Sequence, residues 1–213
     1  MDEKTYNAVK EMTFDAQFYK DRPVALCEVA SWAIWNSSNL SDTEIIEKSI
    51  EKLQPNIVFV LINFAGNGDL YFDNPTWKTW QNFHSYSKMD TRIYNVLSNS
   101  DYKGAYLTDI IKCVPTKNNT ELDLKIKNGE IDMKKQAGIF IDELNILNTD
   151  SIKLYLCGRF TENIFAKHIQ TDTNYYKIKN KIKSYQYVIH PSLMAIRNDE
   201  VFYSKIRNQL RIK

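Results

Sequence analysis

Residues 57–62 read Ile-Val-Phe-Val-Leu-Ile, a run of β-branched and aromatic residues without a polar interruption. A strand with one solvated face alternates apolar and polar side chains, so this run indicates a parallel strand covered on both faces. The preceding Ser41-Asp42-Thr43-Glu44 fits a capping box, and apolar residues on one face follow it. We therefore expect a helix over 42–53 and a buried strand after it.

The same alternation recurs along the chain. Three further apolar runs predict strands at 104–111, 152–157 and 185–189. Helical patterns lie over 94–97, 135–147, 158–169 and 199–210. The first twenty residues indicate another helix, ended by Arg22-Pro23, whereas 24–35 fits either a helix or a strand. The sequence thus predicts one domain over 1–213, an α/β fold of three layers (α/β/α) around a central, mainly parallel four-stranded sheet.

Composition excludes several classes of protein. Of 213 residues, 43% are hydrophobic and 25% charged, with 6 Gly and 5 Pro, which excludes a disordered or fibrous chain. No apolar run approaches the roughly 18 residues of a membrane span, and the start, Met1-Asp2-Glu3-Lys4, is unlike a secretory signal. We expect a cytoplasmic monomer without a membrane partner. Because Cys27, Cys113 and Cys157 are far apart, we expect buried thiols, and no metal or cofactor.

Charge is unevenly distributed. The net charge of +2 argues against a protein that coats nucleic acid by bulk electrostatics. Residues 177–213, however, hold nine Lys or Arg against Asp199 and Glu200, so this segment carries +7 and the remainder −5. A basic face that docks phosphates and an ordinary solvated surface explain these charges equally well.

Polar residues follow each predicted strand. They lie at 63–69, 108–109, 158–159 and 190–192. Ligands of open parallel sheets bind beyond the carboxyl ends of the strands. We therefore expect these four clusters to meet at one rim of the sheet and to form the functional site.

Four segments resemble motifs of the uracil-DNA glycosylase superfamily, and they occur along the chain in the same order as in that family. Residues 105–115, Ala-Tyr-Leu-Thr-Asp-Ile-Ile-Lys-Cys-Val-Pro, are similar to a strand of its iron–sulfur branch. His190-Pro191-Ser192 matches the second motif, 62–66 resembles the first, and 154–159 resembles the Leu-Leu-Gly strand and turn. The resemblance covers about 56–200. The first motif lacks the usual proline and leading glycine, and with three scattered cysteines no iron–sulfur cluster is expected.

The resemblance implies a protein that extrudes a base from DNA and hydrolyses its N-glycosidic bond without a metal. Asn63, or alternatively Asp69, would orient the attacking water, and His190 would donate a hydrogen bond where negative charge grows on the base. Phe83 would stack on the base. The other residues that the resemblance assigns to the site are Phe64, Asp109 and His84 at the base, and Gly66, Pro191, Ser192 and Arg197 at phosphates. Packing explains His84 as well as base binding does.

Asp109 stands where the family has an asparagine that reads uracil. An ionised aspartate only accepts hydrogen bonds, so it suits the N3–H of uracil and repels O4. Guanine offers two adjacent donors, N1–H and the N2 amino group, which a carboxylate can accept together. A base of this kind is therefore one hypothesis. The alternative is that burial keeps Asp109 protonated, so that it imitates asparagine.

Two other functions stay open at this stage. The same pocket could bind a base, a nucleotide or a modified nucleic acid without cleaving it, which the altered first motif favours. A hydrolase of small nucleotides would explain the modest net charge. The expected partner is accordingly DNA, single-stranded or duplex, or a nucleotide-like ligand.

Overall fold

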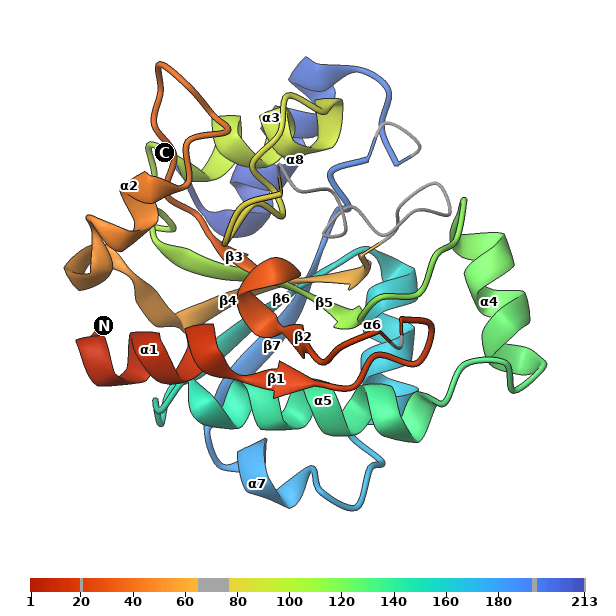
Figure 1. Cartoon of the computed structure of the whole chain (residues 1–213). Coiled ribbons are helices and arrows are strands. Elements are labelled where there is room, and N and C mark those ends of the chain that lie inside the picture. Colours follow the sequence, from red (N-terminus) through yellow and green to blue (C-terminus); the bar gives the residue numbers. More distant parts are fainter. Residues whose placement is uncertain (20, 65–76, 193–194, 213) are drawn as a thin grey trace.

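A mixed five-stranded sheet forms the centre of the computed structural model, which describes residues 1–19, 21–64, 77–192 and 195–212 (Figure 1). Its order is β3-β5-β4-β6-β7. The strands are β3 (Ser31–Trp32), β4 (Gln54–Asn63), β5 (Ala105–Ile111), β6 (Ile152–Cys157) and β7 (Ile182–Val188). The four longer strands are parallel and correspond to the predicted ones, whereas β3 is antiparallel to β5. The predicted number of strands was therefore one too low.

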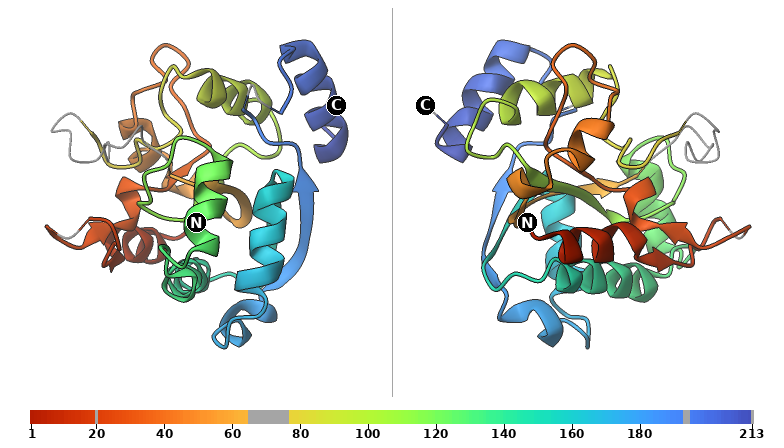
Figure 2. Two further views of the ribbon diagram at one scale, coloured as in Figure 1. Left: turned by 90° about the vertical axis from the view of Figure 1, so that its right-hand side faces the viewer. Right: turned by 60° about the vertical axis from the view of Figure 1, so that its left-hand side comes forward.

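Helices cover both faces of this sheet (Figures 1 and 2). Along β4, Val58, Val60 and Ile62 face one apolar core, and Phe59 and Leu61 face the other. The first core includes residues of α1 (Glu3–Glu11), α4 (Asn119–Lys127), α5 (Met133–Ile146) and α6 (Arg159–Ile164). The second core includes residues of α3 (Lys88–Leu97) and α8 (Asp199–Leu210). The unbroken apolar run of β4 is thus explained by burial on both sides.

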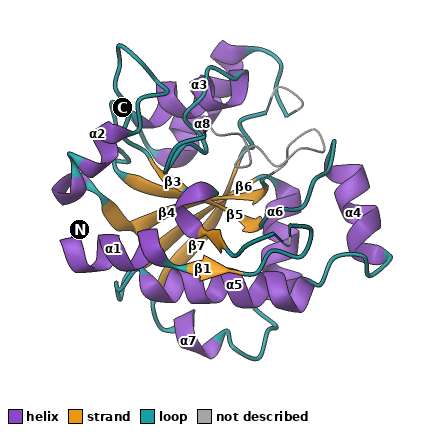
Figure 3. Cartoon of the chain, viewed as in Figure 1, coloured by secondary structure: helices purple, strands orange, loops and turns teal. Residues whose placement is uncertain are grey.

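Short elements complete the described chain (Figure 3). They are β1 (Thr13–Phe14), β2 (Val24–Ala25), α2 (Glu44–Glu47), α7 (Tyr176–Lys179), the 3₁₀ turns η1 (Leu26–Glu28) and η2 (Ile50–Lys52), and the π-helical turn η4 (Phe165–Ile169). β1 and β2 form a separate antiparallel pair. Segment 24–35, which fitted a helix or a strand, contains both β2 and β3 with η1 between them.

The helix predicted over 42–53 is wrong in extent. The chain forms only α2 and η2, with Ser49 in a non-helical conformation at φ −136° and ψ 28° between them. The predicted capping box is absent, because Thr43 is the N-cap residue without a side-chain bond and Asp42 accepts the Glu44 N–H at 3.1 Å. The longer helices carry the expected caps. Asp2, Ser87, Asp132 and Asn198 each accept a backbone N–H at the start of α1, α3, α5 and α8.

Two further expectations from composition can be compared with the structure. Cys27, Cys113 and Cys157 are all buried. Within the described part of the chain, no helix combines the length and the apolar character that crossing a membrane requires.

Candidate functional site

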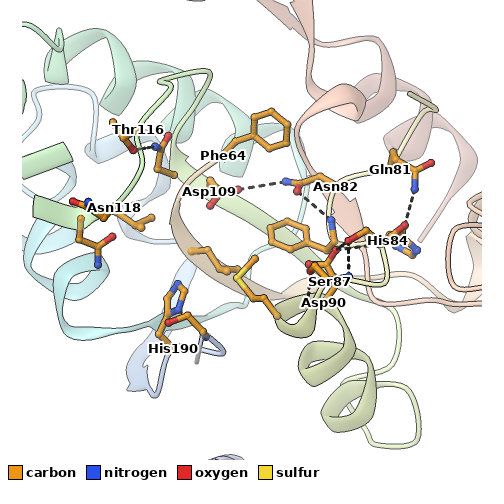
Figure 4. Close-up of a pocket in the computed structure, with 18 of the residues that line it drawn as sticks. Phe64, Gln81, Asn82, His84, Ser87, Asp90, Asp109, Thr116, Asn118 and His190 are labelled. Carbon is orange, nitrogen blue, oxygen red and sulfur yellow. Dashed lines mark hydrogen bonds between the residues drawn. The ribbon is translucent and has the colours of Figure 1, made fainter. Parts of the chain in front are cut away.

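A pocket of about 840 Å³ lies beyond the carboxyl ends of β4 and β5 (Figure 4). Its size is in the range of small-molecule sites. The candidate residues that line it are Asn63, Phe64, Phe83, His84, Asp109, His190 and Ser192. The structure thus brings together the ends of β4, β5 and β7 with the segment that follows the first of these strands. Gly66 and Asp69 lie outside the described residues.

Asn63, the last residue of β4, presents an oriented amide. Its Nδ2 donates to the backbone oxygen of Val114 at 2.8 Å and lies 2.9 Å from Thr116 Oγ1. Because the carbonyl of Val114 can only accept, this contact fixes which end of the amide is nitrogen. The amide oxygen Oδ1 is buried and has no hydrogen-bond partner among the described residues. It is therefore a buried acceptor in the pocket wall that is unpaired among these residues.

Asp109 lies on β5 in the wall of the pocket and is 3% exposed. Its Oδ2 accepts a hydrogen bond from Asn82 Nδ2 at 3.4 Å (Figure 4). Burial raises the pKa of Asp109 from 3.8 to about 7, and the nearby Lys112 ammonium group opposes this rise. A carboxyl with this pKa exists in both protonation states near neutral pH.

Lys112 does not neutralise Asp109 directly. Its Nζ donates to the backbone oxygen of Asp109 at 2.7 Å and forms an ion pair with Glu143 at 2.8 Å, with both side chains fully buried. Glu143 Oε1 also accepts from Tyr106 and Thr108 at 2.9 and 2.6 Å. This network stabilises the end of β5 from the face opposite the pocket, so Lys112 in the family-like segment has a structural role.

His190 follows β7 and enters the pocket as a hydrogen-bond donor. Its Nδ1 accepts the backbone N–H of Ser192 at 3.1 Å, so in the neutral ring the proton is on Nε2. Burial lowers the pKa of His190 from 6.5 to about 4, which keeps the ring neutral at pH 7. Gly158, at φ +98°, lies beneath the ring, and a Cβ there would be 3.3 Å from the Cβ of His190. The glycine of the Leu-Leu-Gly-like turn therefore makes room for the imidazole.

Arg92 of α3 holds the segment that follows His190, a role that sequence reasoning missed. Its guanidinium group is fully buried. It donates to the backbone oxygens of Pro191 and Ser192, each at 3.1 Å, and to that of Ile196 at 2.7 Å. Nε also donates to Asp199 at 2.8 Å. An arginine in an amphipathic helix carries no sequence signal for such a role, because its acceptors are backbone atoms distant in sequence.

The aromatic residues assigned to the base are all buried in the pocket wall. Phe83 lines the pocket with a positive φ of 64°, and its backbone N–H donates to Asn82 Oδ1 at 3.1 Å. Phe64 is 6% exposed. The ring of His84 is fully buried and stacks on Trp35 at 5.2 Å, and Nε2 lies 3.1 Å from the Trp32 oxygen. Burial lowers the pKa of His84 to about 4, so this ring is a neutral part of the pocket wall.

The residues assigned to phosphates are only partly gathered. Ser192 lines the pocket and Pro191 is buried beside it, whereas Arg197 is exposed and outside the wall formed by the described residues. The basic segment from Lys177 onward does not share one face either. α7 packs on α5, where Lys177 pairs with Asp142 at 3.0 Å, whereas α8 packs on α3 across the sheet (Figure 1). Its charge therefore does not form a single phosphate-docking surface.

Among the residues that the structure describes, no group of three or more His, Cys, Asp or Glu side chains is arranged to hold a metal ion. Comparison of the chain with protein-family models, with curated proteins and with solved structures gives no match.

Proposed function

We propose that this pocket binds a nucleobase and that the protein hydrolyses the N-glycosidic bond of a base extruded from DNA. One observation carries the proposal: Asn63, Asp109 and His190, from three separate strand ends, line a single pocket of about 840 Å³. Acceptors and a neutral donor around a cavity with apolar walls suit a flat heterocycle with polar edges. The resemblance of the strand-end motifs to uracil-DNA glycosylases supports the same function.

The proposed reaction follows from these groups. As the bond between C1′ and the base nitrogen breaks, its electron pair moves onto the base and the sugar becomes an oxocarbenium-like cation. His190 Nε2–H donates to the base oxygen on which the charge grows. Asn63 Oδ1 accepts a hydrogen bond from the water that adds to C1′, and the proton lost by this water neutralises the released base. His190 acts as a neutral donor, since its pKa of about 4 leaves it uncharged at pH 7.

The test is incubation with oligonucleotides that carry a panel of normal and modified bases, followed by alkali cleavage and mass analysis. We expect alkali-labile sites and a released base with the wild type. Asn63→Ala and His190→Ala should lose the cleavage while retaining most of the affinity. The matched controls are Asn95→Ala and His168→Ala. Asn95 is exposed on α3, and its amide donates to the Tyr203 hydroxyl of α8. Cleavage that survives Asn63→Ala would contradict the proposed role of the amide.

Base binding without cleavage is the second candidate. It is favoured by Asn63 itself, because an amide can position a water but cannot take its proton. A binding protein would leave every oligonucleotide intact and show salt-dependent affinity. A hydrolase of small nucleotides would release base from nucleosides and ignore duplex DNA.

A further inference from the structure

The carboxyl group of Asp109 is buried in the pocket wall. Among the described residues, its carboxylate accepts a hydrogen bond from Asn82 Nδ2 at 3.4 Å, which is long for a strong interaction. In the described part of the chain, no Lys or Arg forms an ion pair with this carboxylate. The Lys112 ammonium group instead donates to the backbone oxygen of Asp109 and forms an ion pair with the Glu143 carboxylate. An isolated buried carboxylate is costly, so the group gains stability either from a proton or from donors on a ligand.

The groups around Asp109 leave this choice open. Lys112, directly after β5, and Glu143 of α5 act on it in opposite directions: the ammonium group lowers the pKa of Asp109 and the Glu143 carboxylate raises it. Asp90 of α3 adds negative charge from the segment that forms another part of the wall. The remaining titratable neighbours are uncharged at pH 7: burial raises the pKa of the Cys157 thiol on β6 and lowers those of His84 and His190 to about 4.

The two forms of the carboxyl offer different hydrogen bonds to a base. Ionised, it has acceptors alone, which match an edge with two adjacent donors, such as N1–H and the N2 amino group of a guanine-type base. Protonated, it has one donor and one acceptor, which match the carbonyl and N–H of an imide edge such as that of uracil. With the wrong base, the ionised carboxyl places an acceptor against the carbonyl of the imide edge, and the protonated carboxyl places its O–H against one of the two donors of a guanine-type base. Either mismatch leaves buried polar groups unpaired, which strongly disfavours binding.

We infer that Asp109 lets this pocket select between two classes of base edge: an imide edge when its carboxyl is protonated and a two-donor edge when it is ionised. The inference rests on the proposed base-binding function and adds to it a specificity that depends on pH. The sequence-based alternatives, a guanine-type base and an asparagine-like protonated Asp109, become the two states of one site.

The test measures the affinity of wild-type protein for 1-methyluracil and 9-methylguanine between pH 5.5 and 8.0 by titration calorimetry. Neither analogue has a sugar, so cleavage does not interfere. With half-protonation near pH 7, the protonated fraction falls from nearly all to roughly a tenth over this range. We expect affinity for 1-methyluracil to fall by about tenfold and affinity for 9-methylguanine to rise by roughly thirtyfold, so that the preference reverses.

Two variants test the role of Asp109. Asp109→Asn has a fixed donor and acceptor, so it should prefer 1-methyluracil at every pH. Asp150→Asn, at an exposed position that is not among the residues lining the pocket, should retain the reversal.

The outcomes distinguish the two levels of the argument. A preference that does not change with pH, in wild-type protein that binds at least one analogue, would overturn the inference and leave base binding intact. A reversal that persists in Asp109→Asn would also overturn it. Failure of the wild type to bind either analogue at any pH would overturn the proposed base binding, and the inference with it.

Discussion

Replacement of Asp109 by Asn should stabilise the protein at alkaline pH and leave its stability nearly unchanged at acid pH. The folded-state pKa of about 7 lies above the ordinary value of 3.8, so between these values the folded protein retains a proton that the unfolded chain has lost. The free energy of unfolding of the wild type therefore falls as pH rises from about 4 to 7 and is constant above that. At about 1.4 kcal/mol for each pH unit, the cost reaches about 4 kcal/mol.

Asparagine has nearly the same size and cannot ionise, so the variant avoids this cost. Urea unfolding followed by tryptophan fluorescence at pH 4.5, 6 and 8 should show a difference between variant and wild type that grows to about 4 kcal/mol. The lowered pKa values of His84 and His190 act in the opposite direction below pH 6.5, and they cancel because both proteins contain these residues. Asp150→Asn, at an exposed site, is the control. A difference that is the same at all three pH values would refute the reasoning.

Three further substitutions test the supports of the pocket. Arg92→Lys keeps the charge but has only three donors, whereas Arg92 donates to four backbone carbonyls and to Asp199. We expect a loss of about 2–3 kcal/mol in urea unfolding, with faster amide exchange around His190. Unchanged exchange would argue against this role of Arg92. Lys112→Met leaves the Glu143 carboxylate buried without its ion-pair partner and should lower the free energy of unfolding by about 3–5 kcal/mol. The double variant with Glu143→Leu should recover most of this loss. No recovery would mean that the loss arises from packing. Gly158→Ala introduces a Cβ on a residue with a φ of +98°, at 3.3 Å from the Cβ of His190. Thermal unfolding should therefore show a loss of roughly 1–3 kcal/mol in the free energy of unfolding. Unchanged stability would show that the turn adapts to the side chain.

The sequence predicts the parallel part of the sheet well because burial on both faces leaves a clear pattern. The strands at 57–62, 104–111 and 152–157 all appear in the structure. β3 was not predicted as a strand, since its two residues are too few for a periodicity to be visible. The prediction of a helix over 42–53 was wrong for another reason. A capping pattern concerns only where a helix starts, and it carries no information on the interruption at Ser49.

The pocket could be predicted in outline because parallel strands end at the same edge of a sheet. That rule brought Asn63, Asp109 and His190 together without knowledge of the loops. It could not find Arg92, whose acceptors are backbone oxygens about 100 positions away along the chain. The protonation of Asp109 could be stated from the sequence only as one of two alternatives, since it depends on burial and on the distance to the nearest cation rather than on residue type.

The claim that a nucleobase binds in this pocket is tested most directly by NMR. Protein labelled with ¹⁵N-histidine is titrated with 1-methyluracil at pH 5.5, and the histidine resonances are recorded at each step. We expect a neutral His190 ring with its proton on Nε2, whose resonance shifts on binding, while half-buried His168 in η4, which is not among the residues lining the pocket, does not respond. Asp109→Ala should weaken the same titration, whereas Asn63→Ala should leave it largely unchanged. Saturable binding that leaves the His190 resonances unmoved would contradict the account, because the base would then occupy a different place.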